Sequence, residues 1–303
     1  MAFTSDLIAH LPRPLVDALV KARRQNAVFR RWSDYIVDRL RGYDILVRQG
    51  LAKGLTFSSG CSNVGFTFAE HALEPDTERA IQISLKHRMI FYDVGANFGW
   101  LSLIAARIVG PYGKVLSFEP LDSNVRIIQH NVQTNEFANV QILPIALGET
   151  DGRGRFLCSS QPSWGMLAAT GREPGEFIDE TTVTVRRLDT AVREYRLSLP
   201  DVIKIDVEGA EINALRGAAD TLASSRPFML IELHETNAAV ADFLTGLNYQ
   251  CSLPGSSVPI SDAPGNVHVF AVPAERNDCK DMIQAFRDPS FPQCIRCREI
   301  GRN

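Results

Sequence analysis

From residue 89 onward the chain alternates short apolar runs with segments of helical spacing, and this alternation restricts the fold more than any other feature. The apolar runs are MIFYDV, KVLSFE, VQILPIAL, DVIKIDV and FMLIEL. Helical segments separate them, among them GWLSLIAARIVG, DSNVRIIQHNVQTN and AEINALRGAADTLASS. Such alternation is typical of a parallel sheet with helices on both faces. Two later runs, YQCSL and NVHVFAV, predict a terminal antiparallel pair, so we expect a doubly wound α/β domain.

The remaining segments divide the chain around this core. We predict a basic helical extension over residues 1–53, a short hairpin and a helix over 54–87, the ligand-binding α/β domain over 88–275, and a tail over 276–303. The helix PDTERAIQISLKHR has a proline in its first turn, where a missing N–H costs least. Residues 150–187 are too long and too rich in Gly, Thr and Val for a crossover helix, so we expect a loop and hairpin inserted near the site.

Charge and composition limit the partners. Residues 1–53 hold ten Lys/Arg and five Asp/Glu, a surplus of five, so the net charge of −3 leaves −8 for the remainder. An exposed, solvated helix face is the favoured interpretation of the basic segment; an anionic partner is the alternative, and these helices could also pair copies of the chain. A net charge this small does not favour nucleic acid, and we expect none as a partner.

Location and cysteine use follow from two absences. The N-terminus has no secretory pattern, and no apolar run approaches the ~18 residues of a membrane span, so we expect a cytoplasmic protein without a transmembrane segment. Its six cysteines would then be mostly reduced thiols. Cys279, Cys294 and Cys297 could supply three zinc ligands, but a flexible tail with incidental thiols is favoured because a second close pair is missing.

The stretch FYDVGANFGW marks the turn after the first strand of the core, where a doubly wound sheet binds its ligand. Gly95 and Gly99 permit tight backbone angles and close approach of a ligand, whereas Asn97 occupies the place of the second glycine in a dinucleotide motif. A glycine turn alone is weak evidence. The pattern does not obviously provide for a pyrophosphate.

Asp93 narrows the choice of ligand. A carboxylate two residues before Gly95 would repel a pyrophosphate and suit a cation. S-adenosylmethionine, which carries a sulfonium and an ammonium group and no phosphate, meets both conditions. Asp93 could instead merely cap the turn.

Glu119 ends the second core strand twenty residues after Gly99. An acid at this point can accept hydrogen bonds from both ribose hydroxyls of a nucleoside, as in dinucleotide folds, and Pro120 then fixes the exit of the chain. Dehydrogenases share this feature, so it favours a nucleoside ligand without choosing between the two classes.

Further charged residues follow the later strands. Lys204, Asp206 and Glu208 recur at period two in VIKIDVEGAE, and LIELHE places Glu232 and His234 on one side of its strand. Neighbouring parallel strands would bring these groups close to Asp93 at the ligand end. Because a buried charge is costly without a partner, we expect Lys204 to pair with one of the carboxylates.

Asp206, Glu208 and His234 are the predicted catalytic residues. Methyl transfer to an oxygen needs a group that removes the hydroxyl proton or a metal that lowers its pKa. His234 could be that base, and Asp206 could orient the acceptor or the sulfonium. His234 could equally be an ordinary strand-end histidine. The cluster could hold a divalent cation, but its spacings match no dedicated metal motif, so no metal ligand is assigned.

Taken in order, FYDVGANFGW, VLSFEP, ILPIALGE, RRLDT, DVIKIDVEGAEINALRGA and MLIELHE resemble the FkbM family of S-adenosylmethionine-dependent methyltransferases, over roughly Ile90 to Glu235. The resemblance implies a class I methyltransferase (Rossmann-like) fold, with a seven-stranded, mostly parallel sheet whose last strand is antiparallel. It also implies cofactor-binding residues at the glycine turn, the second strand and the third: Asp93, Gly95, Ala96, Asn97, Gly99, Glu119, Pro120, Ala146 and Leu147.

Members of that family typically methylate hydroxyl groups of sugars, glycans or secondary metabolites, so the resemblance implies O-methylation of a small molecule or glycan. N-methylation of a peptide or amine, an NAD-dependent oxidoreductase and a non-catalytic cofactor-binding module are the alternatives. The insert SSQPSWGMLAAT departs from the family pattern, and its Trp164 and Met166 either line a pocket or anchor the insert on the core.

Overall fold

A computed structural model describes residues 44–58, 74–159, 165–168, 177–263 and 265–288 of the protein. Several predictions lie outside these ranges. They concern the helical extension as far as residue 43, Trp164 of the insert, and the cysteine pair near the end of the chain. No helix of the described ranges combines the length and apolarity that a membrane span requires.

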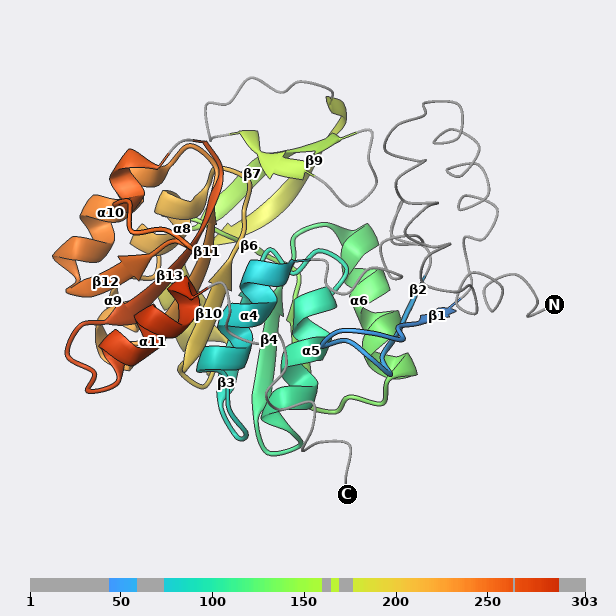
Figure 1. The fold of residues 1–303 in the computed structure, drawn as a ribbon. Helices are drawn as coiled ribbons and strands as arrows, with labels where there is room; N and C mark the ends of the chain where they lie inside the picture. Colours follow the sequence, from blue (N-terminus) through green and yellow to red (C-terminus); the bar gives the residue numbers. More distant parts are fainter. Residues whose placement is uncertain (1–43, 59–73, 160–164, 169–176, 264, 289–303) are drawn as a thin grey trace, which may run out of the picture.

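A seven-stranded sheet forms the centre of the molecule (Figure 1). Its order is β12-β13-β11-β10-β3-β4-β5. In chain order the strands are β3 (Ile90–Val94), β4 (Lys114–Phe118), β5 (Val140–Leu143), β10 (Val202–Ile205), β11 (Phe228–Leu233), β12 (Tyr249–Ser252) and β13 (Val267–Pro273). The five strands from β5 to β11 are parallel, while β13 runs antiparallel to β11 and β12 antiparallel to β13. The prediction of a doubly wound sheet with a terminal antiparallel pair is confirmed, and the strand order is that of the class I methyltransferase fold.

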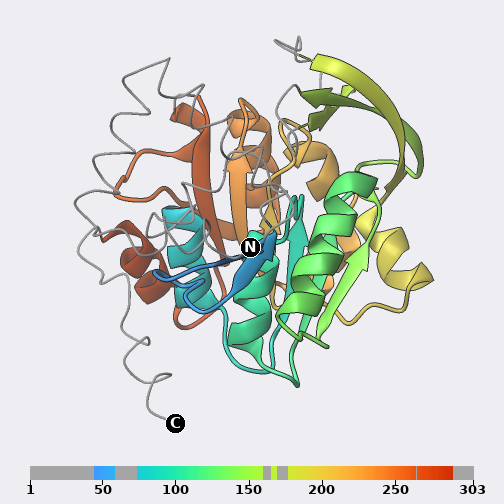
Figure 2. The ribbon, with the colours of Figure 1, turned by 90° about the vertical axis from the view of Figure 1, so that its right-hand side faces the viewer.

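Helices cover both faces of this sheet (Figures 1 and 2). One face carries α4 (Pro75–Ser84), α5 (Trp100–Val109), α6 (Asp122–Thr134) and α11 (Cys279–Arg287). The other carries α7 (Leu188–Glu194), α8 (Glu211–Arg216), α9 (Ala219–Ser225) and α10 (Asn237–Gly246). Because side chains of a strand alternate, Phe91 packs in the first layer and Tyr92 in the second.

Helices α4 and α11 are far apart in the sequence but pack side by side on one face of the sheet. Helix α11 packs against α4, and Arg79 Nη2 donates a hydrogen bond to the Ala285 carbonyl oxygen at 2.7 Å. Phe286 of α11 stacks at a tilt on Phe270 of β13, with ring centroids 5.1 Å apart. Two segments some 200 residues apart in sequence thus close one face of the sheet together.

Two predicted helices differ from the structure. Residues 44–46 form strand β1, which pairs antiparallel with β2 (Thr56–Ser58), so the prediction of helix over these three residues is wrong and the hairpin begins earlier than predicted. The helix predicted over AEINALRGAADTLASS is divided into α8 and α9. The division occurs at Gly217, where a Cβ would lie 2.0 Å from the Gly148 carbonyl oxygen, so a close backbone approach interrupts the helix.

The insert forms a second, four-stranded sheet (Figure 2). Its order is β6-β9-β7-β8, with β6 (Ala146–Leu147), β7 (Gly152–Ser159), β8 (Gly165–Leu167) and β9 (Phe177–Arg186). The predicted strand VQILPIAL is therefore two strands, β5 and β6, separated at Pro144. Proline cannot donate to a sheet ladder, so the chain leaves the main sheet there and enters the second. The predicted hairpin is β7 with β9, and Met166 of β8 is buried against it.

Candidate active site

The glycine turn after β3 is held against the end of β4. The N–H groups of Gly95 and Ala96 both donate to the Phe118 carbonyl oxygen at 3.0 Å. Gly95 has φ +76°, and a Cβ on it would lie 1.9 Å from the Asp206 carbonyl oxygen, so no side chain fits. Gly99, with φ +86°, is the N-cap of α5. The turn therefore needs glycine at Gly95 for both its backbone angle and its packing.

Asn97 takes the left-handed conformation within this turn, with φ +53°. Asparagine adopts this conformation more readily than most residues, so it replaces the expected second glycine without breaking the turn. Its side-chain Oδ1 is buried and has no hydrogen-bond partner among the described residues, although the residue lines a pocket. Asn97 thus offers an acceptor to a ligand.

Glu119 lies directly opposite Asn97, just after β4. Its Oε2 accepts the Asn97 N–H at 2.8 Å, and its Oε1 accepts the Leu121 N–H at 3.0 Å. Burial raises the pKa of Glu119 to about 7, although these two backbone hydrogen bonds act to lower it. A carboxylate can accept about four hydrogen bonds, so this one keeps capacity for ligand hydroxyls.

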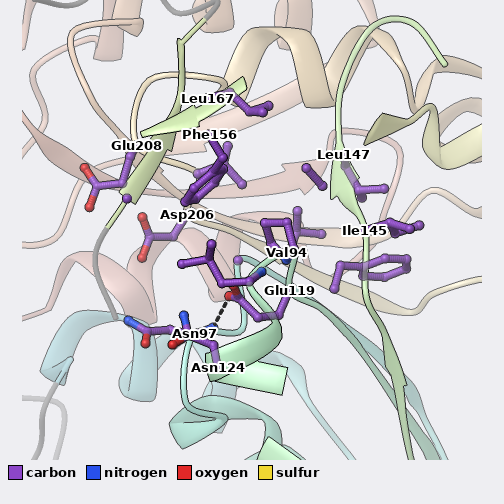
Figure 3. Close-up of a pocket in the computed structure, with 17 residues that line it drawn as sticks. Val94, Asn97, Glu119, Asn124, Ile145, Leu147, Phe156, Leu167, Asp206 and Glu208 are labelled. Atoms are coloured by element: carbon purple, nitrogen blue, oxygen red, sulfur yellow. Dashed lines mark hydrogen bonds between the residues drawn. The ribbon is translucent and has the colours of Figure 1, made fainter. Parts of the chain in front are cut away.

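A pocket of about 630 Å³, including its open mouth, lies over this turn (Figure 3). Asp206 and Glu208 lie at one end of the pocket, and Ile145 and Leu147 lie at the other. The lining as a whole comprises Val94, Gly95, Asn97, Phe118, Glu119, Pro120, Leu121, Asn124, Ile145, Ala146, Leu147, Phe156, Gly165, Leu167, Asp206, Val207 and Glu208.

Among the residues that the structure describes, the lining includes three acids and no lysine or arginine. Of the predicted cofactor residues, Gly95, Asn97, Glu119, Pro120, Ala146 and Leu147 border the pocket, whereas Asp93, Ala96 and Gly99 do not. Phe156 and Leu167 of the second sheet also border it. The sequence placed the insert near the site, but nothing in its pattern singled out these two side chains.

Asp93 lies beneath the turn rather than in the pocket, fully buried. Its Oδ2 accepts a hydrogen bond from Ser102 Oγ at 2.6 Å, and its Oδ1 is 3.6 Å from Lys204 Nζ. Asp93 shares the α5 side of β3 with Phe91, because residues two apart in a strand face the same way. Burial raises the pKa of Asp93 above its ordinary value, and Lys204 opposes this.

Lys204 forms the expected pairing with a carboxylate, and it also contacts a second carboxylate and a backbone carbonyl group. Its ammonium lies 3.6 Å from Asp93 Oδ1 and 3.5 Å from Asp206 Oδ2, and it donates to the Gly95 carbonyl oxygen at 2.9 Å. Burial acts to lower the pKa of Lys204, but the two carboxylates outweigh it and hold the pKa above its ordinary value. Lys204 is therefore a permanent cation that ties β3, the glycine turn and the end of β10 together.

His234 lies among carboxylates at the end of β11. Its Nδ1 is 2.9 Å from Glu211 Oε1, and its Nε2 is 3.3 Å from Glu208 Oε2 and 3.7 Å from Glu232 Oε1. Burial acts to lower the pKa of His234, but Glu211 and Glu208 raise it to about 9. At neutral pH His234 is thus a hydrogen-bond donor to its neighbours, and its predicted role as a free base stays a prediction.

Three residues of this region were not predicted as site residues. Glu211 is fully buried, and it accepts the Gly209 N–H at 2.7 Å and the Thr236 hydroxyl at 2.8 Å besides contacting His234. His268 of β13 places Nε2 3.2 Å from Glu232 Oε2. Glu74, the N-cap of α4, has a pKa raised to about 7 by burial. Glu211 lies only three residues after Glu208 in the same motif, whereas Glu74 and His268 come from distant segments that only the fold brings together.

Comparison with known proteins gives one family match. The family described as "Methyltransferase FkbM domain" matches residues 93–251, just over half of the 303 residues. Among curated proteins, the hexuronic acid methyltransferase AglP of Haloferax volcanii is 26% identical over 161 residues, which are 53% of this chain and 62% of AglP. Methyltransferase 1 of Beauveria bassiana is 26% identical over 204 residues, 61% of this chain and 80% of that protein.

Among solved structures, a methyltransferase FkbM from Methylobacillus flagellatus aligns with a TM-score of 0.43 at 16% identity, covering 70% of this chain and 53% of the other. The match to AglP spans less than two thirds of the length of that protein.

Proposed function

The chain belongs to the FkbM methyltransferase family, and from this we propose that it transfers a methyl group from S-adenosylmethionine to a hydroxyl of a small molecule or glycan. AglP, a relative, is a hexuronic acid methyltransferase, which supports a sugar as the class of acceptor. The single observation that carries the choice of cofactor is the lining of the pocket, which combines acids with an apolar end and has no basic side chain among the described residues.

The residues fit this cofactor. Glu119 has unused acceptor capacity for ribose hydroxyls, and Asn97 Oδ1 is a buried acceptor without a partner among the described residues. Ile145, Leu147 and Phe156 form an apolar wall for an adenine ring. A pyrophosphate would meet acids and no basic side chain from the described lining, which disfavours a dinucleotide.

The acceptor side of the proposal rests on Asp206 and Glu208, which border the acidic end of the pocket. When bound, S-adenosylmethionine supplies an electrophilic methyl group on a sulfonium. Asp206 and Glu208 would orient the acceptor hydroxyl, and one of these carboxylates would accept its proton as the methyl group leaves the sulfur, with His234 Nε2 3.3 Å from Glu208 Oε2. Orienting the acceptor in this way contributes much of the rate in reactions of this kind.

Calorimetry with S-adenosylhomocysteine tests the proposal. We expect binding by the wild type and binding at least about tenfold weaker by Glu119→Ala, since hydrogen bonds to a charged group contribute about 1.5–3 kcal/mol. Glu180→Ala, which removes an exposed acid of the second sheet, should bind as the wild type does. Absence of S-adenosylhomocysteine binding, or tighter binding of NADH measured by fluorescence, would overturn the assignment.

His234→Ala then tests the type of transfer. Methylation of a hydroxyl depends on the arrangement of the acidic end, so we expect a large loss of kcat with little change in the affinity for S-adenosylhomocysteine. Unchanged turnover would instead favour an amine acceptor, which needs less help with its proton.

A further inference from the structure

The ends of two neighbouring strands bring together three side chains of the types that ligate metals in proteins. Asp206 follows β10, Glu232 lies in β11 and His234 follows it. One ligand atom from each lies within 4.8 Å of the other two. Strands β10 and β11 are parallel and in register, which fixes this convergence in the rigid centre of the sheet.

In two of these three side chains, His234 and Glu232, the second polar atom contacts another residue. His234 turns Nδ1 to Glu211, and its Nε2 lies 3.3 Å from Glu208 Oε2 and 3.7 Å from Glu232 Oε1. Glu232 Oε2 forms an ion-pair contact with His268 Nε2, 3.2 Å away, and its Oε1 faces His234. Metal-binding histidines are usually oriented by a second layer of hydrogen bonds, as Glu211 orients His234.

A separate observation, at the start of α4, adds a further buried carboxylate to this region. Glu74 Oε2 is buried and has no hydrogen-bond partner among the described residues. The charge of Glu74 interacts first with that of Lys204 and then with those of Asp206, Asp93 and Glu232, so its carboxylate faces the same charged region from another element. Buried carboxylates are costly unless they are paired or bind a metal, and Lys204 is already shared between Asp93 and Asp206.

We propose that Asp206, Glu232 and His234 bind a divalent transition-metal cation, which accepts both carboxylate and imidazole ligands and for which Mn²⁺ serves as the probe. Asp206 also borders the cofactor pocket, so the cation would lie on the acceptor side of that pocket. There it would lower the pKa of a hydroxyl bound to it, a role that rests on the proposed methyl transfer. Binding of the cation itself does not depend on that activity.

Titration with Mn²⁺, followed by the loss of the free-ion signal in electron paramagnetic resonance, tests the site on full-length protein treated with a chelator. We expect one Mn²⁺ per chain in the wild type and at least about tenfold weaker binding by Glu232→Gln. His268→Ala, which keeps all three donors but releases Glu232, should weaken binding by about 10–100-fold. Glu180→Gln, which removes an exposed acid elsewhere, serves as the matched control and should bind as the wild type does.

Absence of Mn²⁺ binding by the wild type, or binding by Glu232→Gln as tight as that of the wild type, would overturn the proposal. If Glu232→Gln does not fold by circular dichroism, His268→Ala decides the question in its place. S-adenosylhomocysteine binding is measured on the same samples, and Glu232 does not border the pocket, so we expect that affinity to change less than about twofold. A protein that binds Mn²⁺ but not S-adenosylhomocysteine would contradict the proposed function and leave the metal site standing.

Discussion

At the scale of single residues, the turn after β3 depends on backbone conformation more than on side-chain chemistry. Gly95 is excluded from carrying a side chain by the Asp206 carbonyl oxygen, and Asn97 tolerates a left-handed conformation. The glycines could be identified in the sequence, but Asn97 occupied the place where a dinucleotide motif has its second glycine. The structure explains it as a second residue suited to positive φ.

Gly95→Ala is predicted to destabilise the turn and the pocket together. A left-handed conformation alone costs an L-residue about 1–2 kcal/mol, and the contact at 1.9 Å adds to that cost. We expect a lower midpoint in urea unfolding and a large loss of S-adenosylhomocysteine affinity. Gly246→Ala, at a position with open space around it, is the control and should lower neither the urea midpoint nor the affinity. Equal behaviour of the two variants would contradict this account of the turn.

Glu119 gives the cofactor site a predicted pH dependence. Burial raises the pKa of its carboxyl group above the ordinary value, to about 7, and ribose hydroxyls donate best to the ionised form. Affinity for S-adenosylhomocysteine should therefore rise as the pH increases from about 6 to 8 and level off above the pKa. Calorimetry at several pH values measures this profile. Glu119→Gln should show weak, pH-independent binding, whereas a flat profile in the wild type would rule Glu119 out as its source.

At the scale of elements, Lys204 joins two strands and a turn. Strands β3 and β10 are adjacent in the sheet, with Asp93 opposite Lys204 in the register. The expectation that a lysine in a buried strand must meet a carboxylate was sufficient to predict this pairing. The same expectation could not predict that Asp93 pairs with Lys204 and lies below the pocket, where it does not contribute to the lining.

Lys204→Met is predicted to cost about 3–5 kcal/mol of unfolding free energy, because removal of one partner leaves buried carboxylates without compensation. Urea unfolding at pH 7.5 measures the loss. Adding Asp93→Asn to the same variant should restore part of it, since one of the unpaired charges is then gone. Lys114→Met, at an exposed lysine, should change stability little. A double variant no more stable than Lys204→Met would show that the pairing is not the cause.

The second sheet contributes a wall of the cofactor pocket through Phe156 and Leu167. Phe156→Ala should weaken S-adenosylhomocysteine binding about tenfold, in line with the apolar burial that a phenylalanine provides. The neighbouring Arg155 is exposed and pairs with Glu180 on the same sheet, so Arg155→Ala is the matched control in calorimetry. If both variants bind equally well, the second sheet does not contribute to cofactor affinity.

At the scale of the whole molecule, local periodicity was enough to predict the central sheet, its antiparallel end and the position of Glu119 beside the pocket. The wrong predictions concern segments whose secondary structure depends on contacts with backbone far away in the sequence. Contact with Gly148 divides α8 from α9, and pairing with β2 makes a strand of residues 44–46. Likewise, Glu74 and His268 join the acidic region only after the chain has folded, so spacing along the sequence could not reveal them.

The packing of α11 against α4 has a consequence for how the chain is made. Helix α4 leaves the ribosome before α11, which contributes Phe286 to the same face only after about 200 further residues have been synthesised. At a synthesis rate of about 5–20 residues per second, the apolar surface of α4 stays without its contacts to α11 for on the order of ten seconds or more. During that interval the nascent chain offers a binding surface to chaperones, and it loses that surface when translation reaches the last described helix.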